Sequence, residues 1–266
     1  MPENYTPGYS PNAINFMARR TAASHAAFFL PYLRPGMHIL DCGCGPGTIT
    51  LGLASAIAPG KVTAIDKADS QILNAWDNAK KQEISNVDFI SANIYALPFV
   101  ENSFDAVFAH AVFEHLQKPV QALRELWRVL KPEGIIGVRS PDWGGFLMVP
   151  TTPTLDRAID YCKFLQQQNG GNPCIGRELR ALLRQAGFIN VKATATYECY
   201  EPLSLPAEYL ALRIEASAEI EQAIDKGWVD GQASLLAMSE SLREWSQHPD
   251  GFFAQTWCEV VGKKSV

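Results

Sequence analysis

Short apolar segments alternate with amphipathic segments through the first two thirds of the chain. The apolar segments are bounded by turn residues and are rich in β-branched or aromatic side chains, which is typical of buried parallel strands. They cover residues 38–43, 61–66, 87–91, 104–110 and 134–140. Between the last two, Leu123, Leu126, Trp127 and Leu130 recur at the spacing of one helix face. This alternation predicts an α/β fold built on a parallel sheet.

The alternation stops after Ser140. Residues 141–175 are rich in proline, glycine and aromatic side chains, which predicts an insertion over the edge of the sheet. Two late strand-like segments, 189–200 and 251–264, are expected to pair as an antiparallel edge. Helices are expected over 11–33, 48–58, 120–130, 176–188 and 206–247. We expect one domain over residues 1–266, with an N-terminal helical cap over about 1–35 and lid insertions over about 141–175 and 201–250.

Composition and charge narrow the function classes. The 266 residues are 47% hydrophobic and 19% charged, as in a globular protein with a core. A net charge of −5 without any block of Lys or Arg argues against a nucleic-acid partner. The sequence shows neither a secretory signal nor a long apolar run that predicts a membrane span. Its six scattered cysteines indicate reduced thiols, so we expect a cytoplasmic protein with no membrane partner.

The segment DCGCGPGT, residues 41–48, lies between a predicted strand and a predicted helix. A strand, a glycine-rich turn and a helix N-terminus in this order are typical of a site for an adenine-nucleoside cofactor. The spacing D-x-G-x-G-x-G differs from the G-x-G-x-x-G of dinucleotide folds, where the helix N-terminus meets a pyrophosphate. Asp41 before the glycines suits a ligand whose nearby end is an ammonium group, as in S-adenosylmethionine (SAM). The spacing therefore disfavours an NAD-dependent oxidoreductase.

The pair Cys42 and Cys44 raises the alternative of a metal or redox site. Two cysteines at this spacing supply at most two zinc ligands, and the sequence has no second Cys/His pair at the spacing of a zinc finger. A free cysteine often packs as a small hydrophobic residue. We therefore expect no metal and assign the chemistry of this segment to its glycines.

The longer segment LDCGCGPGT, residues 40–48, resembles the first motif of class I SAM-dependent methyltransferases. Three further segments resemble the ubiquinone/menaquinone-biosynthesis type of methyltransferase domain (methyltransferase domain 11-like). They are AID at 64–66, ALPFVENSFDAVFAHAVFEHL at 96–116 and ALRELWRVLKPEGIIGV at 122–138. The resemblance covers residues 36–140 well and the flanks only loosely. It implies a Rossmann-like sheet of seven strands, the last antiparallel, with flanking helices and a helical lid, and it implies SAM as cofactor and S-adenosyl-L-homocysteine (SAH) as product.

Asp66 ends the second predicted strand, nineteen residues after Gly47. A carboxylate at this place accepts hydrogen bonds from ribose hydroxyls in dinucleotide folds, although a helix-capping or turn Asp is the alternative. The resemblance implies that Asn93, which stands where the family usually has an acid, and the backbone of Ile94 meet the adenine. It also implies Ile72 as an apolar cover for the ring.

His110 ends the fourth predicted strand, where the resemblance implies contact with the methionine part of the cofactor. This histidine is a candidate general base because its ordinary pKa lies near working pH, and the alternative is a histidine that only packs. The N-terminal segments YTPGYS and ARRTAAS resemble a lead-in of some of these methyltransferases. The resemblance implies that Tyr9 closes over the cofactor and that Arg20 pairs with its carboxylate, unless Arg20 is an exposed helix charge. The expected cofactor residues are Tyr9, Arg20, Asp41, Gly43, Cys44, Gly45, Gly47, Thr48, Asp66, Lys67, Ile72, Asn93, Ile94 and His110.

The predicted insertion supplies candidate substrate residues, namely Asp142, Trp143 and Phe146. Aromatic side chains in a lid suit an apolar or ring-bearing acceptor, although they also suit simple packing of a cap. Methyl transfer from a sulfonium is an in-line displacement, so the enzyme must hold the acceptor collinear with the S–CH3 bond in a dry pocket. A base is needed only when the acceptor must lose a proton early.

We therefore expect an enzyme that transfers the methyl group of SAM to an oxygen, nitrogen or carbon atom of a small metabolite. The segment HAVFEH, residues 110–115, stands where methyltransferases of adenine or of glutamine amides carry [DNS]-P-P-[YF], which the resemblance counts against those substrates. Two alternatives stay open: a methyltransferase for RNA or protein, and a non-catalytic SAM-binding protein. The expected oligomeric state is a monomer or homodimer.

Overall fold

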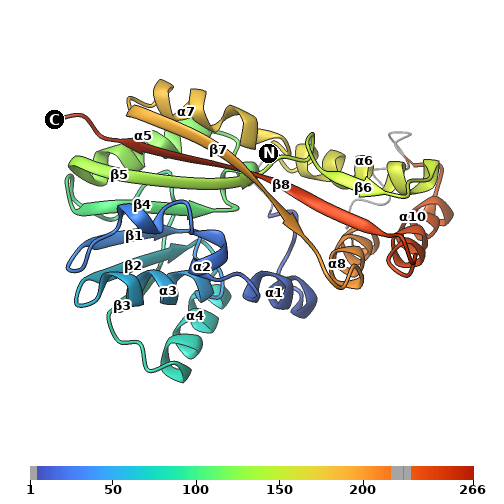
Figure 1. Cartoon of the computed structure of the whole chain (residues 1–266), viewed down its shortest axis with the longest axis horizontal. Helices are drawn as coiled ribbons and strands as arrows, with labels where there is room; N and C mark the ends of the chain where they lie inside the picture. The colour runs from blue at the N-terminus through green and yellow to red at the C-terminus, as the bar shows by residue number, and fades with distance from the viewer. Residues whose placement is uncertain (1–4, 217–223, 225–228) are drawn as a thin grey trace.

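An eight-stranded mixed sheet forms the centre of the molecule (Figure 1). The structure is a computed structural model, and it describes residues 5–216, 224 and 229–266. The strands are β1 (His38–Cys42), β2 (Lys61–Asp66), β3 (Val87–Ser91), β4 (Phe104–His110), β5 (Leu130–Pro141), β6 (Leu147–Val149), β7 (Ile189–Cys199) and β8 (Phe252–Lys263). Their order is β3-β2-β1-β4-β5-β8-β6, with β7 also paired to β8.

Strands β1 to β5 pair in parallel, as their apolar segments predict. Strand β8 is antiparallel to β5, β6 and β7. The predicted α/β sheet with an antiparallel last strand is therefore confirmed. The short strand β6 is an addition that the sequence analysis did not predict, because three residues are too few to show an alternating pattern.

Helices cover both faces of the parallel strands. One face packs against α2 (Ala22–His25), α3 (Thr48–Ile57) and α4 (Asp69–Lys81), and the other against α5 (Pro119–Val129) and α7 (Leu179–Gln185). The predicted helix over 120–130 ends one residue early, because Leu130 already pairs with Phe104 of β4. The parallel strands are thus buried on both sides, which explains their nearly continuous apolar sequences.

A separate helical layer lies at one end of the sheet, where β7 and β8 extend beyond the parallel strands (Figure 1). It contains β6, α6 (Pro153–Gln168), α8 (Ser204–Glu215) and α10 (Gln232–Trp245), which share a third apolar core. We call these four elements the lid. The helix α6 falls within the predicted insertion 141–175, whereas residues 217–223 and 225–228 of the second predicted insertion lie outside the described residues.

The N-terminal segment bridges the lid and the sheet. Helix α1 (Pro11–Ala18) packs against α8, and its Phe16 ring stacks on Tyr209 with 4.4 Å between the ring centroids. Short turns of 3₁₀ helix occur at η1 (Leu30–Tyr32), η2 (Phe113–His115) and η3 (Ile175–Glu178). Among the described helices, none has both the length and the apolar character of a membrane span.

Candidate functional site

The glycine-rich loop connects β1 to α3 at the carboxyl end of the sheet. Gly43, Gly45 and Gly47 have φ angles of +72°, +53° and +81°, a region that side chains with a Cβ rarely adopt. A Cβ on Gly43 would clash with the Val112 side chain, so the loop passes close to the segment after β4. Helix α3 begins without a side-chain cap, which leaves its first N–H groups free for a ligand.

Two carboxylates flank this loop. Asp41 is buried, and its Oδ2 accepts a hydrogen bond of 2.6 Å from the Thr50 hydroxyl. Burial raises the pKa of Asp41 to about 7, against the opposing effect of that hydrogen bond. Asp66 accepts hydrogen bonds from the backbone N–H groups of Gly45 and Ala68, each 3.0 Å long, while burial keeps its pKa above the ordinary value. The loop therefore lies between two carboxyl groups whose pKa values are both raised by burial.

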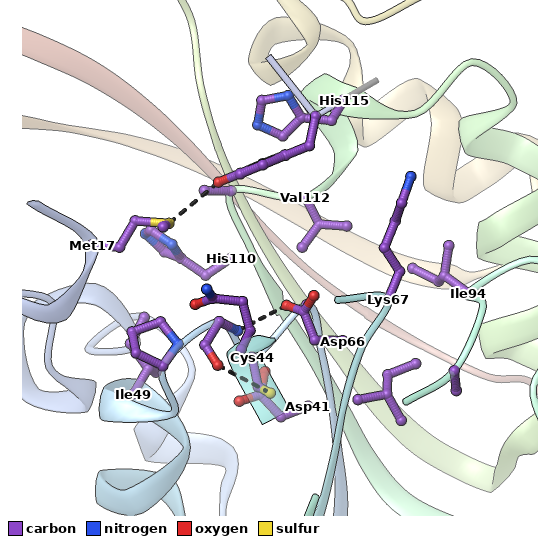
Figure 2. Close-up of a pocket in the computed structure, with 18 of the residues that line it drawn as sticks. Met17, Asp41, Cys44, Ile49, Asp66, Lys67, Ile94, His110, Val112 and His115 are labelled. Carbon is purple, nitrogen blue, oxygen red and sulfur yellow. Dashed lines mark hydrogen bonds between the residues drawn. The ribbon is translucent and has the colours of Figure 1, made fainter. Parts of the chain in front are cut away.

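A cavity of about 450 Å³ opens over the loop and the ends of β1, β2 and β4. Figure 2 shows Asp41 and Cys44 at one end of this cavity and His115 at the other, with Asp66 and Lys67 along one side. We call it the cofactor cavity. Twelve of the predicted cofactor residues line it: Tyr9, Arg20, Asp41, Gly43, Cys44, Gly45, Thr48, Asp66, Lys67, Asn93, Ile94 and His110.

Gly47 and Ile72, also predicted as cofactor residues, do not line this cavity. A Cβ on Gly47 would lie 2.9 Å from the Ala75 Cβ, so this glycine lets α3 pack against α4. Ile72 points into the apolar core between α4 and the sheet. The prediction was wrong by one position on α4, because its neighbour Gln71 faces the cavity instead.

Gln71 is a site residue that the sequence analysis missed. Its side chain is 1% exposed, and both its amide nitrogen and its amide oxygen lack a hydrogen-bond partner in the described structure. Buried polar groups in native proteins are nearly always paired, so an unpaired amide that faces a cavity indicates a polar ligand. The available signal was a polar residue in the same helical stripe as Ala75 and Ala79.

His110 lines the cavity, but its surroundings do not suit a general base. Its Nε2 lies 3.0 Å from Arg139 Nη1, and because a guanidinium can only donate, this nitrogen must be the acceptor. Burial, together with the charges of Arg20 and Arg139, holds the pKa of His110 well below its ordinary value. The lone pair that a base requires is therefore occupied in this structure, which disfavours His110 as a general base, and its catalytic role stays a prediction.

A second cavity, of about 70 Å³, adjoins the first on the side of the lid. The two cavities share Tyr5, Met17, Arg20, Ala111 and His115. The walls of the second cavity come from the N-terminal segment, η2, α6, α8 and β8. Its aromatic lining residues are Tyr5, Phe16, Trp143, Tyr200, Tyr209, Phe253 and Trp257.

Of the three predicted substrate residues, Trp143 alone lines this second cavity. Asp142 is buried and held by the guanidinium of Arg177 at 2.6 and 2.7 Å, so it joins β5 to η3 rather than facing a substrate. Phe146 packs against the rings of Trp143 and Phe253 in the lid core. Neither residue faces the second cavity, because Asp142 pairs with Arg177 and Phe146 packs in the core of the lid.

The cysteines of the loop are buried thiols. Burial raises the pKa of Cys42 and of Cys44 well above the ordinary value, which makes both poor metal ligands and poor nucleophiles. Within the described part of the chain, no three residues of the His, Cys, Asp and Glu types cluster as metal ligands would.

Comparison with known proteins agrees with this geometry. A family model described as a methyltransferase domain matches residues 33–193. The chain belongs to this methyltransferase family. An uncharacterized methyltransferase of Schizosaccharomyces pombe is 31% identical over 93% of this chain and 91% of its own length. A demethylmenaquinone methyltransferase of Listeria welshimeri is 34% identical over 38% of this chain and 44% of its own length, in agreement with the menaquinone-type resemblance.

A solved structure shows the same fold. A SAM-dependent methyltransferase from Aquifex aeolicus superposes with a TM-score of 0.54, at 22% identity, over 70% of this chain and 91% of that one. As a methyltransferase the chain is an enzyme, and SAM is its cofactor. The glycines of the loop, the unpaired amide of Gln71 and the carboxylates of Asp41 and Asp66 fit a nucleoside that carries both hydroxyl and ammonium groups.

Proposed function

We propose that this methyltransferase acts on a small-molecule acceptor, which binds in the second cavity beside the cofactor. The observation that carries the proposal is the junction of the two cavities through five shared residues. A site that methylates a polymer must accommodate a long chain, whereas the second cavity is small and is lined in part by residues of the lid. The net charge of −5 agrees with an acceptor other than nucleic acid.

The proposal assigns roles to the residues around the cofactor cavity. The carboxylate of Asp66 would bind the ribose hydroxyls, and Asn93 with the backbone of Ile94 would bind the adenine. Asp41 would stabilise the ammonium of the amino-acid part, and Arg20, which is half-buried and has no ion pair in the described structure, would bind its carboxylate. The side-chain amide of Gln71 also lines the cofactor cavity.

When bound, SAM supplies a methyl group on a positively charged sulfur. The task of the chain is then to hold the acceptor in line with that methyl group and to exclude water. Tyr5 and Met17, whose hydroxyl and sulfur atoms are 3.2 Å apart, lie at the junction of the two cavities. Because His110 is occupied by Arg139, the chemistry does not depend on this histidine as a base.

The first test is binding of SAH to an Asp66→Ala variant, measured by calorimetry. We expect the variant to bind SAH about a hundredfold more weakly, because it loses hydrogen bonds to a charged acceptor. Asp69→Ala is the matched control, since Asp69 is exposed at the start of α4 and does not line the cavity. Unchanged affinity in a folded Asp66→Ala protein would refute the ribose assignment.

The second test addresses the acceptor. The protein is incubated with a cell extract and SAM labelled in its methyl group, and the products are separated by ultrafiltration. We expect the label to appear in the filtrate, among small molecules. Label that stays with retained RNA or protein would overturn the small-molecule proposal, and binding of SAH without any label transfer would favour the non-catalytic alternative.

A further inference from the structure

The second cavity contains an unusual number of buried polar atoms without partners. In the described structure, eleven buried side-chain atoms lack a hydrogen bond, and five of them belong to residues that line this cavity. They are Glu114 Oε2, His115 Nδ1, Arg213 Nε, Gln255 Oε1 and Trp257 Nε1. Leaving such groups unpaired is costly, so their concentration in one place indicates a polar ligand.

The charge of the cavity is positive. Arg213 comes from α8, and its Nη2 donates to the backbone carbonyl of Cys162 at 3.2 Å, but no carboxylate of the described residues pairs with its guanidinium. By contrast, the buried guanidinium of Arg139 contacts the Glu259 carboxylate at 3.1 Å. Arg213 is therefore available to an anion.

The one acid in the lining does not cancel this charge. Glu114 is 3% exposed, and burial raises its pKa to about 7, so much of it is protonated near neutral pH. His115 is neutral near pH 7, since burial lowers its pKa to about 3, so it adds no further positive charge. Among the residues that line the cavity, an ammonium-bearing acceptor would meet Arg213 and Arg20 but no fully ionised carboxylate. The ionised Glu198 interacts with Arg20 and does not line the cavity.

The rings of the cavity favour a flat ligand. Phe16 stacks on Tyr209 at an interplanar angle of 7°, and on Tyr200 at 18° with 5.8 Å between centroids. Tyr200 in turn stacks on Phe253 at 26°. These rings line the same cavity as Arg213, and an aromatic lining favours a ligand with a planar ring.

We propose that the second cavity binds an acceptor with a planar, apolar body and a carboxylate, and that Arg213 binds the carboxylate. The proposal rests on the proposed function, because it names the substrate class of the same site. The carboxylate is the group of the acceptor that Arg213 binds. The atom to be methylated lies elsewhere on the acceptor, toward the residues that both cavities share. The volume of the second cavity is only about 70 Å³, so the acceptor must also extend into the space that this cavity shares with the cofactor cavity.

The experiment titrates SAH-saturated protein with benzoate, with benzamide and with benzylammonium. Trp143 and Trp257 line the cavity, so quenching of tryptophan fluorescence reports occupancy without any turnover. We expect benzoate to bind at least tenfold more tightly than either of the other probes. We expect Arg213→Gln to weaken benzoate binding by about tenfold to a hundredfold, the effect of losing a hydrogen-bonded charge.

Arg157→Gln is the matched control, because Arg157 is exposed on α6 and does not line the cavity. Equal affinities for benzoate and benzylammonium would overturn the proposal, as would an Arg213→Gln protein that binds benzoate like the control. Calorimetry with SAH alone shows whether a negative result concerns the acceptor or the cofactor site. Normal SAH binding with no preference for benzoate refutes the acceptor class and leaves the proposed function standing, whereas loss of SAH binding refutes the cofactor site itself.

Discussion

Replacing Glu259 by glutamine is expected to lower the free energy of unfolding by about 3 kcal/mol, at the lower end of the range for breaking one partner of a buried ion pair. The Glu259 carboxylate accepts a hydrogen bond of 3.1 Å from Arg139 Nε, and the two side chains are 8% and 4% exposed. Glutamine keeps the shape but removes the charge, so the buried guanidinium of Arg139 would lose its hydrogen-bonded counter-charge and keep only the electrostatic attraction of Glu198. Thermal unfolding should show a drop in Tm of roughly 10 °C.

The size of the expected effect follows from the position of the pair. Arg139 faces Glu259 across the β5–β8 pairing and faces His110 across the β4–β5 pairing. From β7, the hydroxyls of Thr194 and Thr196 donate to the Glu259 carboxylate at 3.1 and 2.9 Å. One charged residue on β8 thus completes a hydrogen-bonded row that crosses four strands beside the cofactor cavity.

Glu133→Gln is the control for this prediction. Glu133 pairs with Lys263, which is also on β8, but both side chains are exposed, and such pairs contribute about 1 kcal/mol or less. A double variant, Arg139→Met with Glu259→Gln, should recover part of the lost stability because it leaves no unpaired charge. If Glu259→Gln unfolds at the same temperature as Glu133→Gln, the buried pair is not the stabilising element that its geometry indicates.

The sequence contains enough information for the sheet and for the loop. Buried parallel strands have continuous apolar segments, and the loop has glycines at the three positions where φ is positive, so both features are local. The antiparallel β7–β8 edge could also be predicted, since both segments are long enough to show their pattern.

The errors arise where a role depends on distant contacts. The cofactor face of α4 was assigned to Ile72, yet one residue changes the direction of a helical side chain by about 100° and brings Gln71 to the cavity. Asp142 was predicted as a substrate residue, but in the structure its carboxylate accepts a hydrogen bond from Arg177, 35 residues away in the sequence. The histidine His110 has an ordinary pKa in isolation, and only the fold places Arg139 against its free nitrogen. The second cavity could not be predicted for the same reason, because its walls come from segments spread over the whole chain.

The affinity for SAH is expected to fall about tenfold for each pH unit between pH 7 and pH 5, and Asp41 is the proposed cause. Burial raises the pKa of this carboxyl group to about 7 in the free protein. The ammonium of the ligand favours the ionised carboxylate, so binding below pH 7 must remove a proton from Asp41. The ligand itself keeps its charges over this range.

The same shift gives the opposite sign for folding. The pKa of Asp41 is higher in the folded protein than its ordinary value of 3.8, so the folded state holds a proton that the unfolded state releases. This contribution to stability is complete below pH 4 and is lost as the pH rises through 7. The free protein thus becomes less stable over the pH range in which its affinity for SAH increases. These opposite trends of stability and SAH affinity distinguish the titration of Asp41 from a general unfolding of the protein at low pH.

The contribution of Asp41 can be separated from those of neighbouring groups. The thiols of Cys42 and Cys44 stay protonated throughout, because burial raises both pKa values. Asp66 also faces the cavity and also has a raised pKa, so the variants must separate the two carboxylates. In Asp41→Asn, SAH affinity should be weak and nearly independent of pH between 5 and 8. Asp69→Ala should keep the profile of the unmodified chain.

Calorimetry in buffers of different ionisation enthalpy provides a second measurement of the same step. Near pH 6, binding of SAH to the unmodified chain should release up to about one proton, and binding to Asp41→Asn should release none. The Thr50 hydroxyl, which donates to the Asp41 carboxylate, offers a graded test, because Thr50→Val removes a hydrogen bond that lowers this pKa. The variant should therefore shift the affinity profile toward higher pH. An affinity that is the same at pH 5 and pH 7 would mean that the ammonium of the cofactor does not lie beside Asp41.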